Sequence, residues 1–205
     1  MSRWIHRYTA GERSNHWAVA ISFVLAAPSG LALFHPAFYF LSHLFGGGTW
    51  DRILHPYLGV FLTLVFLLLA FRFWRRNVIR PRDREWMRHM GDELCNRDER
   101  MPETGKYNGG QKVLFWTLVI IIPTLLVSGI IIWRPWFAPA FPLVVLRIAV
   151  LIHAVVAWLM ILAIIVHVYA ALWVKGSVRA MTRGTVSAAW ARHHHRAWYR
   201  EMTGK

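Results

Sequence analysis

The sequence predicts an all-α integral membrane protein, a four-transmembrane-helix bundle formed by residues 1–205 as a single domain. Three observations carry this prediction: four long runs without charged residues, basic residues concentrated in alternate segments, and histidines near the ends of the runs. The runs indicate the number of helices, the basic residues indicate their orientation, and the histidines indicate a bound group.

The uncharged runs, counted without Asp, Glu, Lys or Arg, are Ser14–Phe34, Ile53–Phe71, Val113–Trp133 and Ile148–Val174, of 21, 19, 21 and 27 residues. Each is long enough to cross the hydrocarbon core of a bilayer. Four of them in 205 residues leave too little polar chain to shield them from water. We therefore expect transmembrane helices at about 14–34, 53–74, 111–133 and 148–174.

The basic residues indicate how these helices are oriented. Segments 1–14, 72–112 and 175–205 contain 21 of the 24 Lys and Arg residues, whereas 35–52 and 134–149 contain three. The positive-inside rule places both termini and the central loop in the cytoplasm (N-in/C-in), for a multi-pass protein of the bacterial cytoplasmic (inner) membrane. The net charge of +14 is spread through juxtamembrane segments, which indicates contact with anionic membrane lipid and not with nucleic acid.

Four histidines lie near the ends of the apolar runs. His16 opens the first run, His55 opens the second, and His153 and His167 lie fourteen residues apart on the fourth. A helix of fourteen residues rises about 21 Å and returns to within about 40° of its starting face, so both histidines of the fourth run share one face. An ionisable side chain inside a membrane helix is costly, which makes each a candidate functional residue. Depth pairs His16 with His167 on the cytoplasmic side, and His55 with His153 on the external side.

Two such pairs predict two haems, with the four histidines as axial ligands of the irons. Cys95 is the only cysteine and no C-x-x-C-H motif is present, so the haems would be held non-covalently as b-type groups. Two axial histidines leave no open position on the iron, so such a centre transfers electrons. A single histidine at a membrane interface is more often a solvated polar residue, and solvent contact is expected for His6, His35, His43 and His89. The run His193–His195 is expected to belong to a basic interfacial tail.

Glycines within the expected helices indicate where a flat ligand or a neighbouring backbone approaches closely. Gly30, Gly59 and Gly129 are the glycines in question. Gly59 lies one turn after His55 on the same face, where a porphyrin needs room, although simple helix–helix contact explains it equally well.

Several motifs resemble one family over essentially the whole chain. In order they are Glu12–Trp17, Arg52–Pro56, Gly105–Lys112, Ile132–Pro135, Leu151–Ala154, Trp173–Ser177, and the tail from His193-His194 to Trp198–Arg200. They closely resemble the cytochrome b (gamma) subunit of respiratory membrane-bound formate dehydrogenase. The resemblance implies the same pairing of haem ligands and an iron–sulfur (beta) subunit and a catalytic molybdenum or tungsten (alpha) subunit as partners. It implies that this chain does not oxidise formate itself but passes electrons from the external iron–sulfur subunit to quinone and contributes to proton-motive force.

The resemblance also implies a quinone site beside the cytoplasmic haem, at Gly110, Gln111 and His167. The third helix is expected to begin near Gln111, so free backbone N–H groups and the Gln111 amide are available to a quinone carbonyl. An ordinary turn and helix start is the alternative interpretation of Asn108–Gly110.

Two other functions remain open from the sequence. One is the cytochrome b subunit of another respiratory oxidoreductase, of the hydrogenase or thiosulfate reductase type. The other is a haem-free membrane transporter or anchor. The spans contain no Asp, Glu, Lys or Arg, which disfavours an ion path built on carboxylates. One cysteine also cannot hold an iron–sulfur cluster.

Overall fold

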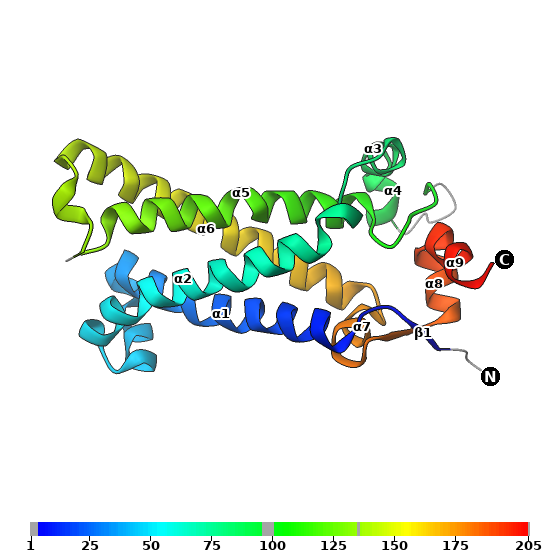
Figure 1. The fold of residues 1–205 in the computed structure, drawn as a ribbon, viewed down its shortest axis with the longest axis horizontal. Coiled ribbons are helices and arrows are strands. Elements are labelled where there is room, and N and C mark those ends of the chain that lie inside the picture. The colour runs from blue at the N-terminus through cyan, green and yellow to red at the C-terminus, as the bar shows by residue number, and fades with distance from the viewer. Residues whose placement is uncertain (1–3, 96–100, 135, 205) are drawn as a thin grey trace. The chain divides into compact units, whose positions relative to one another are not determined.

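The computed structural model describes residues 4–95, 101–134 and 136–204, and the chain is mostly helical (Figure 1). Pro135, which ends one of the motifs above, lies outside the described residues. Within the described residues four helices are long and apolar enough to cross a membrane, with mean hydropathies of 1.9 to 2.9. They are α1 (Ala10–Phe34), α2 (Gly48–Phe73), α5 (Gly109–Ile132) and α6 (Leu143–Trp173).

The four helices end within one residue of the predicted positions but begin two to five residues earlier. The reason is visible at α1, where Thr9 and Glu12 form a reciprocal capping box: Glu12 N donates to Thr9 Oγ1 at 3.2 Å, and Thr9 N donates to Glu12 Oε2 at 2.8 Å. A carboxylate in the first turn also stabilises the positive end of the helix dipole. The prediction was based on runs of uncharged residues, so it left the charged first turns out of the predicted helices.

The chain divides into two compact units. The bundle unit comprises residues 14–69 and 118–166, which are the central parts of the four long helices with their connections. The polar unit comprises residues 1–13, 70–117 and 167–205, which are both terminal segments, the central loop and the adjoining helix ends.

In the bundle unit, α1 and α2 are joined by the 3₁₀ helix η1 (Pro36–Phe45), and the loop between α5 and α6 contains η4 (Ala138–Ala140). Asn15 Nδ2 of α1 donates to the Val65 carbonyl of α2 at 2.8 Å. Aromatic contacts join α1 to α6 through Phe34 and Trp158, and α2 to α5 through Tyr57 and Trp133. Most large apolar side chains of these helices are exposed, as expected for surfaces that face lipid.

The polar unit contains short elements around a two-stranded antiparallel sheet, which the all-α prediction did not include. β1 (Trp4–His6) pairs with β2 (Thr185–Ser187), with Ile5 opposite Val186. The helices here are η2 (Trp74–Arg76), α3 (Pro81–Arg88), α4 (Met90–Leu94), α7 (Ser177–Arg183), α8 (Ala188–His194) and α9 (Arg196–Thr203). Gly184, which ends α7 at φ +77°, leaves its carbonyl to accept from the backbone N–H of Arg7 at 2.8 Å. A Cβ at this position would lie 2.6 Å from the Tyr8 carbonyl.

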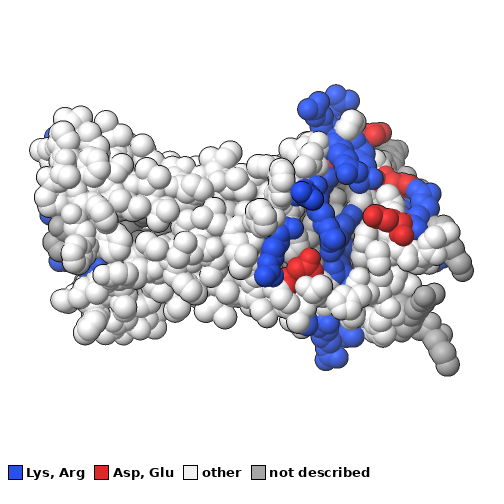
Figure 2. Space-filling view, in the orientation of Figure 1, with Lys and Arg blue, Asp and Glu red and all other residues white. Residues whose placement is uncertain are grey.

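The charges of the two units differ strongly. The three segments of the polar unit carry 21 of the 24 basic residues in the sequence. Figure 2 shows Lys and Arg side chains gathered over the elements of this unit, with Asp and Glu interspersed. The face of the bundle unit in the same view is almost entirely uncharged (Figure 2).

Candidate functional site

His55 and His153 lie side by side in the bundle unit, although 98 positions separate them in the sequence. His55 is in the first third of α2 and His153 in the first half of α6. Their ring centroids are 6.2 Å apart and the ring planes are inclined at 78°. The structure therefore brings together the two histidines that depth matching paired on the expected external side.

Each of these rings is held by a serine from the neighbouring helix. Ser29 Oγ of α1 lies 2.8 Å from His55 Nδ1, and Ser128 Oγ of α5 lies 3.0 Å from His153 Nδ1. Both contacts use Nδ1, which leaves Nε2 as the remaining nitrogen of each ring. Nε2 is one of the two imidazole nitrogens that ligate metals.

Glycines follow both serines and make room for the rings. A Cβ on Gly30 would lie 3.0 Å from His55 Cε1, and a Cβ on Gly129 would lie 3.2 Å from His153 Cε1. A Cβ on Gly59 would meet no atom within 4 Å. The dipeptide Ser-Gly thus supplies a polar atom and free space at both histidines, and open space lies one turn beyond His55.

The separation of the rings fits a haem held between them. An imidazole nitrogen lies about 2.0 Å from a bound metal ion and about 1.1 Å from its own ring centre, so two imidazoles that held one iron between them would have ring centres about 6.2 Å apart. The observed 6.2 Å is close to this value. The ligand role of His55 and His153 stays a prediction.

The other predicted pair is divided between the two units. His16 belongs to the bundle unit, where its ring packs edge-on against Trp17 with centroids 5.6 Å apart, and His167 belongs to the polar unit. Both side chains are partly buried. Their pairing as ligands of a second haem stays a prediction.

The residues implied for a quinone site, Gly110, Gln111 and His167, all belong to the polar unit. Gln111 forms a capping box with Asn108 at the start of α5: its backbone N donates to Asn108 Oδ1 at 2.9 Å, and its Oε1 accepts from Asn108 N at 3.1 Å. The side-chain oxygen of Gln111 is therefore engaged in the fold. Its exposed amide nitrogen is the part that remains to donate to a ligand.

The glycines before Gln111 have a packing role that the sequence did not indicate. A Cβ on Gly109 would lie 2.8 Å from both the Asp83 carbonyl and the Trp86 ring, and a Cβ on Gly110 would lie 3.1 Å from Trp86. Trp86 of α3 is buried at this point. These glycines let α3 pack directly against the start of α5.

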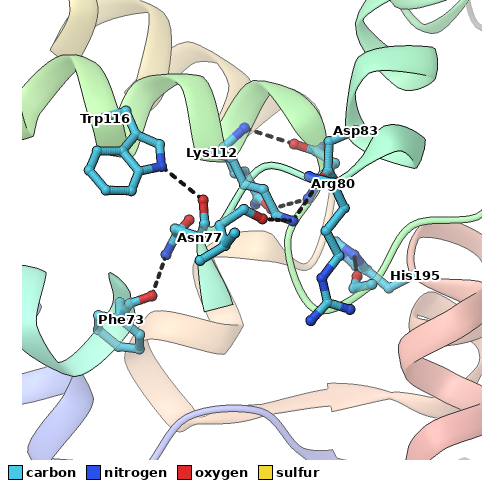
Figure 3. Close-up of polar contacts among 11 residues, drawn as sticks. Phe73, Asn77, Arg80, Asp83, Lys112, Trp116 and His195 are labelled. Carbon is cyan, nitrogen blue, oxygen red and sulfur yellow. Dashed lines mark hydrogen bonds and ion pairs between the residues drawn. The ribbon is translucent and has the colours of Figure 1, made fainter. Parts of the chain in front are cut away.

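A buried ion pair fixes the same contact (Figure 3). Lys112 Nζ of α5 lies 2.6 Å from Asp83 Oδ2 of α3 and donates to the Val78 carbonyl at 3.0 Å. Asp83 Oδ2 also accepts from Arg80 N at 2.7 Å, so the carboxylate is well hydrogen-bonded. One turn further along α5, Trp116 Nε1 donates to the Asn77 carbonyl at 2.9 Å.

His195 is buried inside the polar unit, although the sequence predicted only that the run His193–His195 belongs to a basic interfacial tail. Its Nδ1 lies 2.7 Å from the Gly105 carbonyl, which can only accept, so Nδ1 carries the proton and Nε2 accepts from Arg7 Nη2 at 3.1 Å. Arg7 is itself buried, donates to the Lys106 carbonyl, and stacks over the Trp190 and Trp198 rings at 4.9 Å. This contact ties the C-terminal helices to the N-terminal arm and the central loop.

Burial shifts the titration of three groups in this region. It lowers the pKa of His195 well below its usual value, with the Arg7 charge as a second cause. It lowers the pKa of Lys106 to about 8, with Arg76 adding to the effect. It raises the pKa of the Tyr107 hydroxyl well above its usual value, with the adjacent Tyr8 adding to the effect.

Ser29 and Ser128 are the site residues that the sequence interpretation missed. Their signal is a Ser-Gly pair in an apolar helix, 26 residues before His55 in the first case and 25 before His153 in the second. Each helical hairpin, α1–α2 and α5–α6, repeats this arrangement.

Comparison with known proteins identifies the family. Residues 7–184 match the family model described as prokaryotic cytochrome b561. The chain is 48% identical over 198 residues to the cytochrome b556(fdo) subunit of formate dehydrogenase from Escherichia coli K12, covering 97% of this chain and 93% of that protein. It is 41% identical over 201 residues to the nitrate-inducible cytochrome b556(Fdn) subunit of the same organism, covering 98% and 93%. It is 40% identical over 197 residues to the cytochrome b556 subunit of formate dehydrogenase from Haemophilus influenzae, covering 96% and 83%. The predicted resemblance is thereby confirmed, and the chain belongs to the prokaryotic cytochrome b561 family, together with the cytochrome b subunits of formate dehydrogenases.

Proposed function

We propose that this chain is the dihaem cytochrome b subunit of a formate dehydrogenase in the bacterial cytoplasmic membrane. It takes electrons from an external iron–sulfur subunit and delivers them to quinone on the cytoplasmic side. Formate oxidation belongs to a separate catalytic subunit that carries molybdenum or tungsten. The chain itself supplies the membrane path for the electrons.

The observation that carries this proposal is the pair of rings at His55 and His153, 6.2 Å apart, each held through Nδ1 by a serine. This arrangement suits one bis-histidine haem b on the external side, and such a haem supplies a one-electron carrier with no open coordination position. The family membership supports the same cofactor. A transporter needs no such pair of oriented imidazoles.

The second half of the path involves His16 and His167 as ligands of a second haem b on the cytoplasmic side. Quinone would bind beside that haem at Gly110, Gln111 and His167. The exposed Gln111 amide supports this proposal because it retains a donor that can reach a quinone carbonyl. Quinone reduction there consumes cytoplasmic protons, while formate oxidation outside releases them, so the complex contributes to proton-motive force.

The composition of the polar unit supports the proposed orientation. Both terminal segments and the central loop belong to this one compact unit, and its segments carry 21 of the 24 basic residues. Loops and termini that pack into one compact unit lie on the same side of a membrane, and the positive-inside rule assigns that side to the cytoplasm.

The proposal is tested by the haem content of the purified complex. A pyridine haemochrome assay should return two haems b per cytochrome chain, and His55→Ala should remove one while leaving the other. His43→Ala is the matched control, because this exposed histidine of the bundle unit has no proposed ligand role and should leave both haems in place. A chain without haem would contradict the proposal. A wild-type chain with only one haem, which is lost in His16→Ala and also in His55→Ala, would contradict the pairing.

A further inference from the structure

The two serines beside His55 and His153 have hydroxyl groups whose own hydrogens already have acceptors. Ser29 Oγ donates to the Ala26 carbonyl at 2.9 Å, one turn earlier in α1. Ser128 Oγ donates to the Thr124 carbonyl at 2.7 Å, one turn earlier in α5. With its hydrogen committed to a backbone carbonyl, each serine oxygen is left to accept a hydrogen bond from the facing imidazole.

The hydrogen bonds of the two serines decide which ring nitrogen carries the proton. Ser29 Oγ lies 2.8 Å from His55 Nδ1, and Ser128 Oγ lies 3.0 Å from His153 Nδ1. A hydroxyl has one hydrogen, and a serine oxygen that donates it to a backbone carbonyl can only accept from the ring nitrogen that it faces, so that nitrogen carries the proton. Each histidine therefore has Nδ1 protonated and Nε2 bare.

We infer that Ser29 and Ser128 are positioning residues that fix the tautomer and the orientation of His55 and His153, so that both present a bare Nε2 to one iron. This inference rests on the proposed ligand role of the two histidines. A metal-bound histidine generally donates its other N–H to an acceptor, which orients the ring and makes it a stronger ligand. In a membrane span, where water is excluded, a side-chain hydroxyl can serve as the acceptor for that N–H.

The serines also affect the redox equilibrium of the haem. A hydrogen bond from Nδ1 to an acceptor makes Nε2 a better electron donor, which favours ferric over ferrous iron. Removing the acceptor therefore raises the midpoint potential of the haem held by that histidine. A tenfold loss of the ferric preference corresponds to a rise of about 59 mV for a one-electron couple.

The test is an optical redox titration of membranes that contain the full complex with Ser29→Ala or Ser128→Ala. In each variant we expect the midpoint potential of one haem to rise, because its preference for ferric iron falls by up to about tenfold. The other haem should keep its potential. Haem retention should fall by about 10- to 100-fold in affinity, the usual effect of removing a partner of a metal ligand. The ferric low-spin electron paramagnetic resonance signal should also change, because the 78° angle between the rings is no longer fixed.

Two further variants separate positioning from packing. Ser22→Ala is the matched control on α1, because buried Ser22 donates to the Ala18 carbonyl at 2.6 Å in the same way but has no histidine partner in that bond. It should leave both potentials unchanged. Ser29→Thr keeps the hydroxyl and should restore the wild-type potential. If Ser29→Thr shifts as Ser29→Ala does, the effect belongs to side-chain packing and the inference is overturned.

The outcomes also separate this inference from the proposed function. Unchanged potentials and resonance signal in both alanine variants, with two haems present, would overturn the inference alone. A wild-type complex without a haem that depends on His55 would overturn the proposed function and the inference together.

Discussion

At the residue scale, Gln111 has two amide functions, and the fold uses only one of them. The oxygen accepts from Asn108 N in the capping box of α5, and this bond stabilises the start of the helix whether or not a quinone binds. The amide nitrogen is the group that a quinone carbonyl would need. A substitution that preserves the oxygen and removes the nitrogen therefore distinguishes the two roles.

Gln111→Glu and Gln111→Ala should both slow haem oxidation by quinone. The glutamate keeps an oxygen for the capping box but has no N–H donor, and one lost hydrogen bond of about 0.5–1.5 kcal/mol weakens quinone affinity roughly two- to twelve-fold. The measurement is stopped-flow reoxidation of the reduced haems over a range of concentrations of a soluble quinone analogue.

The alanine variant provides the comparison. It also loses the capping bond, so the helix start is weakened in addition. Reoxidation that is normal in Gln111→Glu and slow in Gln111→Ala would assign Gln111 to the helix start alone. Haem spectra should be nearly unchanged in both variants, because Gln111 is not a proposed ligand.

The sequence indicated His55 and His153 because a histidine in an apolar run is rare and costly. It did not indicate Ser29 and Ser128, because a serine in a membrane helix is common and usually bonds back to its own helix, as Ser22 does. Only the tertiary arrangement shows that two of these hydroxyls also face a histidine. A local pattern cannot specify a partner on another helix.

At the scale of elements, the four long helices were predictable because their apolar length decides them. Their starts were less predictable, because two of them are capping boxes, Thr9–Glu12 and Asn108–Gln111. The polar residues of a capping box are also typical of loops. The pattern of a small polar residue followed three positions later by Glu or Gln was readable in both cases.

The sheet and the buried tail were not predictable in this way. β1 and β2 have three residues each and lie near opposite ends of the chain, so neither has a periodicity of its own. The sequence placed His195 in a basic interfacial tail and did not indicate that it accepts from Arg7, 188 positions earlier. Long-range pairing decides both features.

The docking of α8 and α9 should depend on pH through His195. The pKa of His195 is lowered in the folded state, so the undocked tail binds a proton first as the pH falls below about 6.5. Docking stability is therefore full above that pH and is lost below it, by up to about 1.4 kcal/mol per pH unit. Hydrogen–deuterium exchange of residues 185–204, corrected for intrinsic rates, should show less protection at pH 5.5 than at pH 7.5.

His195→Gln is the control for this pH dependence, because glutamine does not titrate. Its tail should exchange faster than the wild type at pH 7.5 but should change little between the two pH values. Equal protection of the wild-type tail at both pH values would show that His195 does not control docking.

At the scale of the whole molecule, the three segments of the polar unit carry 21 of the 24 basic residues, and the bundle unit carries the other three (Figure 2). The bundle unit contains the His55–His153 pair, and the polar unit contains Gln111 and the ion pair of Lys112 with Asp83. Electron entry and quinone reduction are thus proposed for different units, as a subunit that moves charge across a membrane requires.

The final prediction concerns the orientation of these units in the membrane. The terminal segments share one compact unit with the central loop, and that unit carries most of the basic residues, so the C-terminus should be cytoplasmic and the η1 region external. Alkaline phosphatase, which is active only outside the cytoplasm, should be active when inserted within residues 43–50 and inactive when fused after residue 205. Green fluorescent protein at the same two positions should give the reverse, which controls for expression. An external C-terminus would place Gln111 outside and would reverse the direction of proton consumption, contradicting the proposed contribution to proton-motive force.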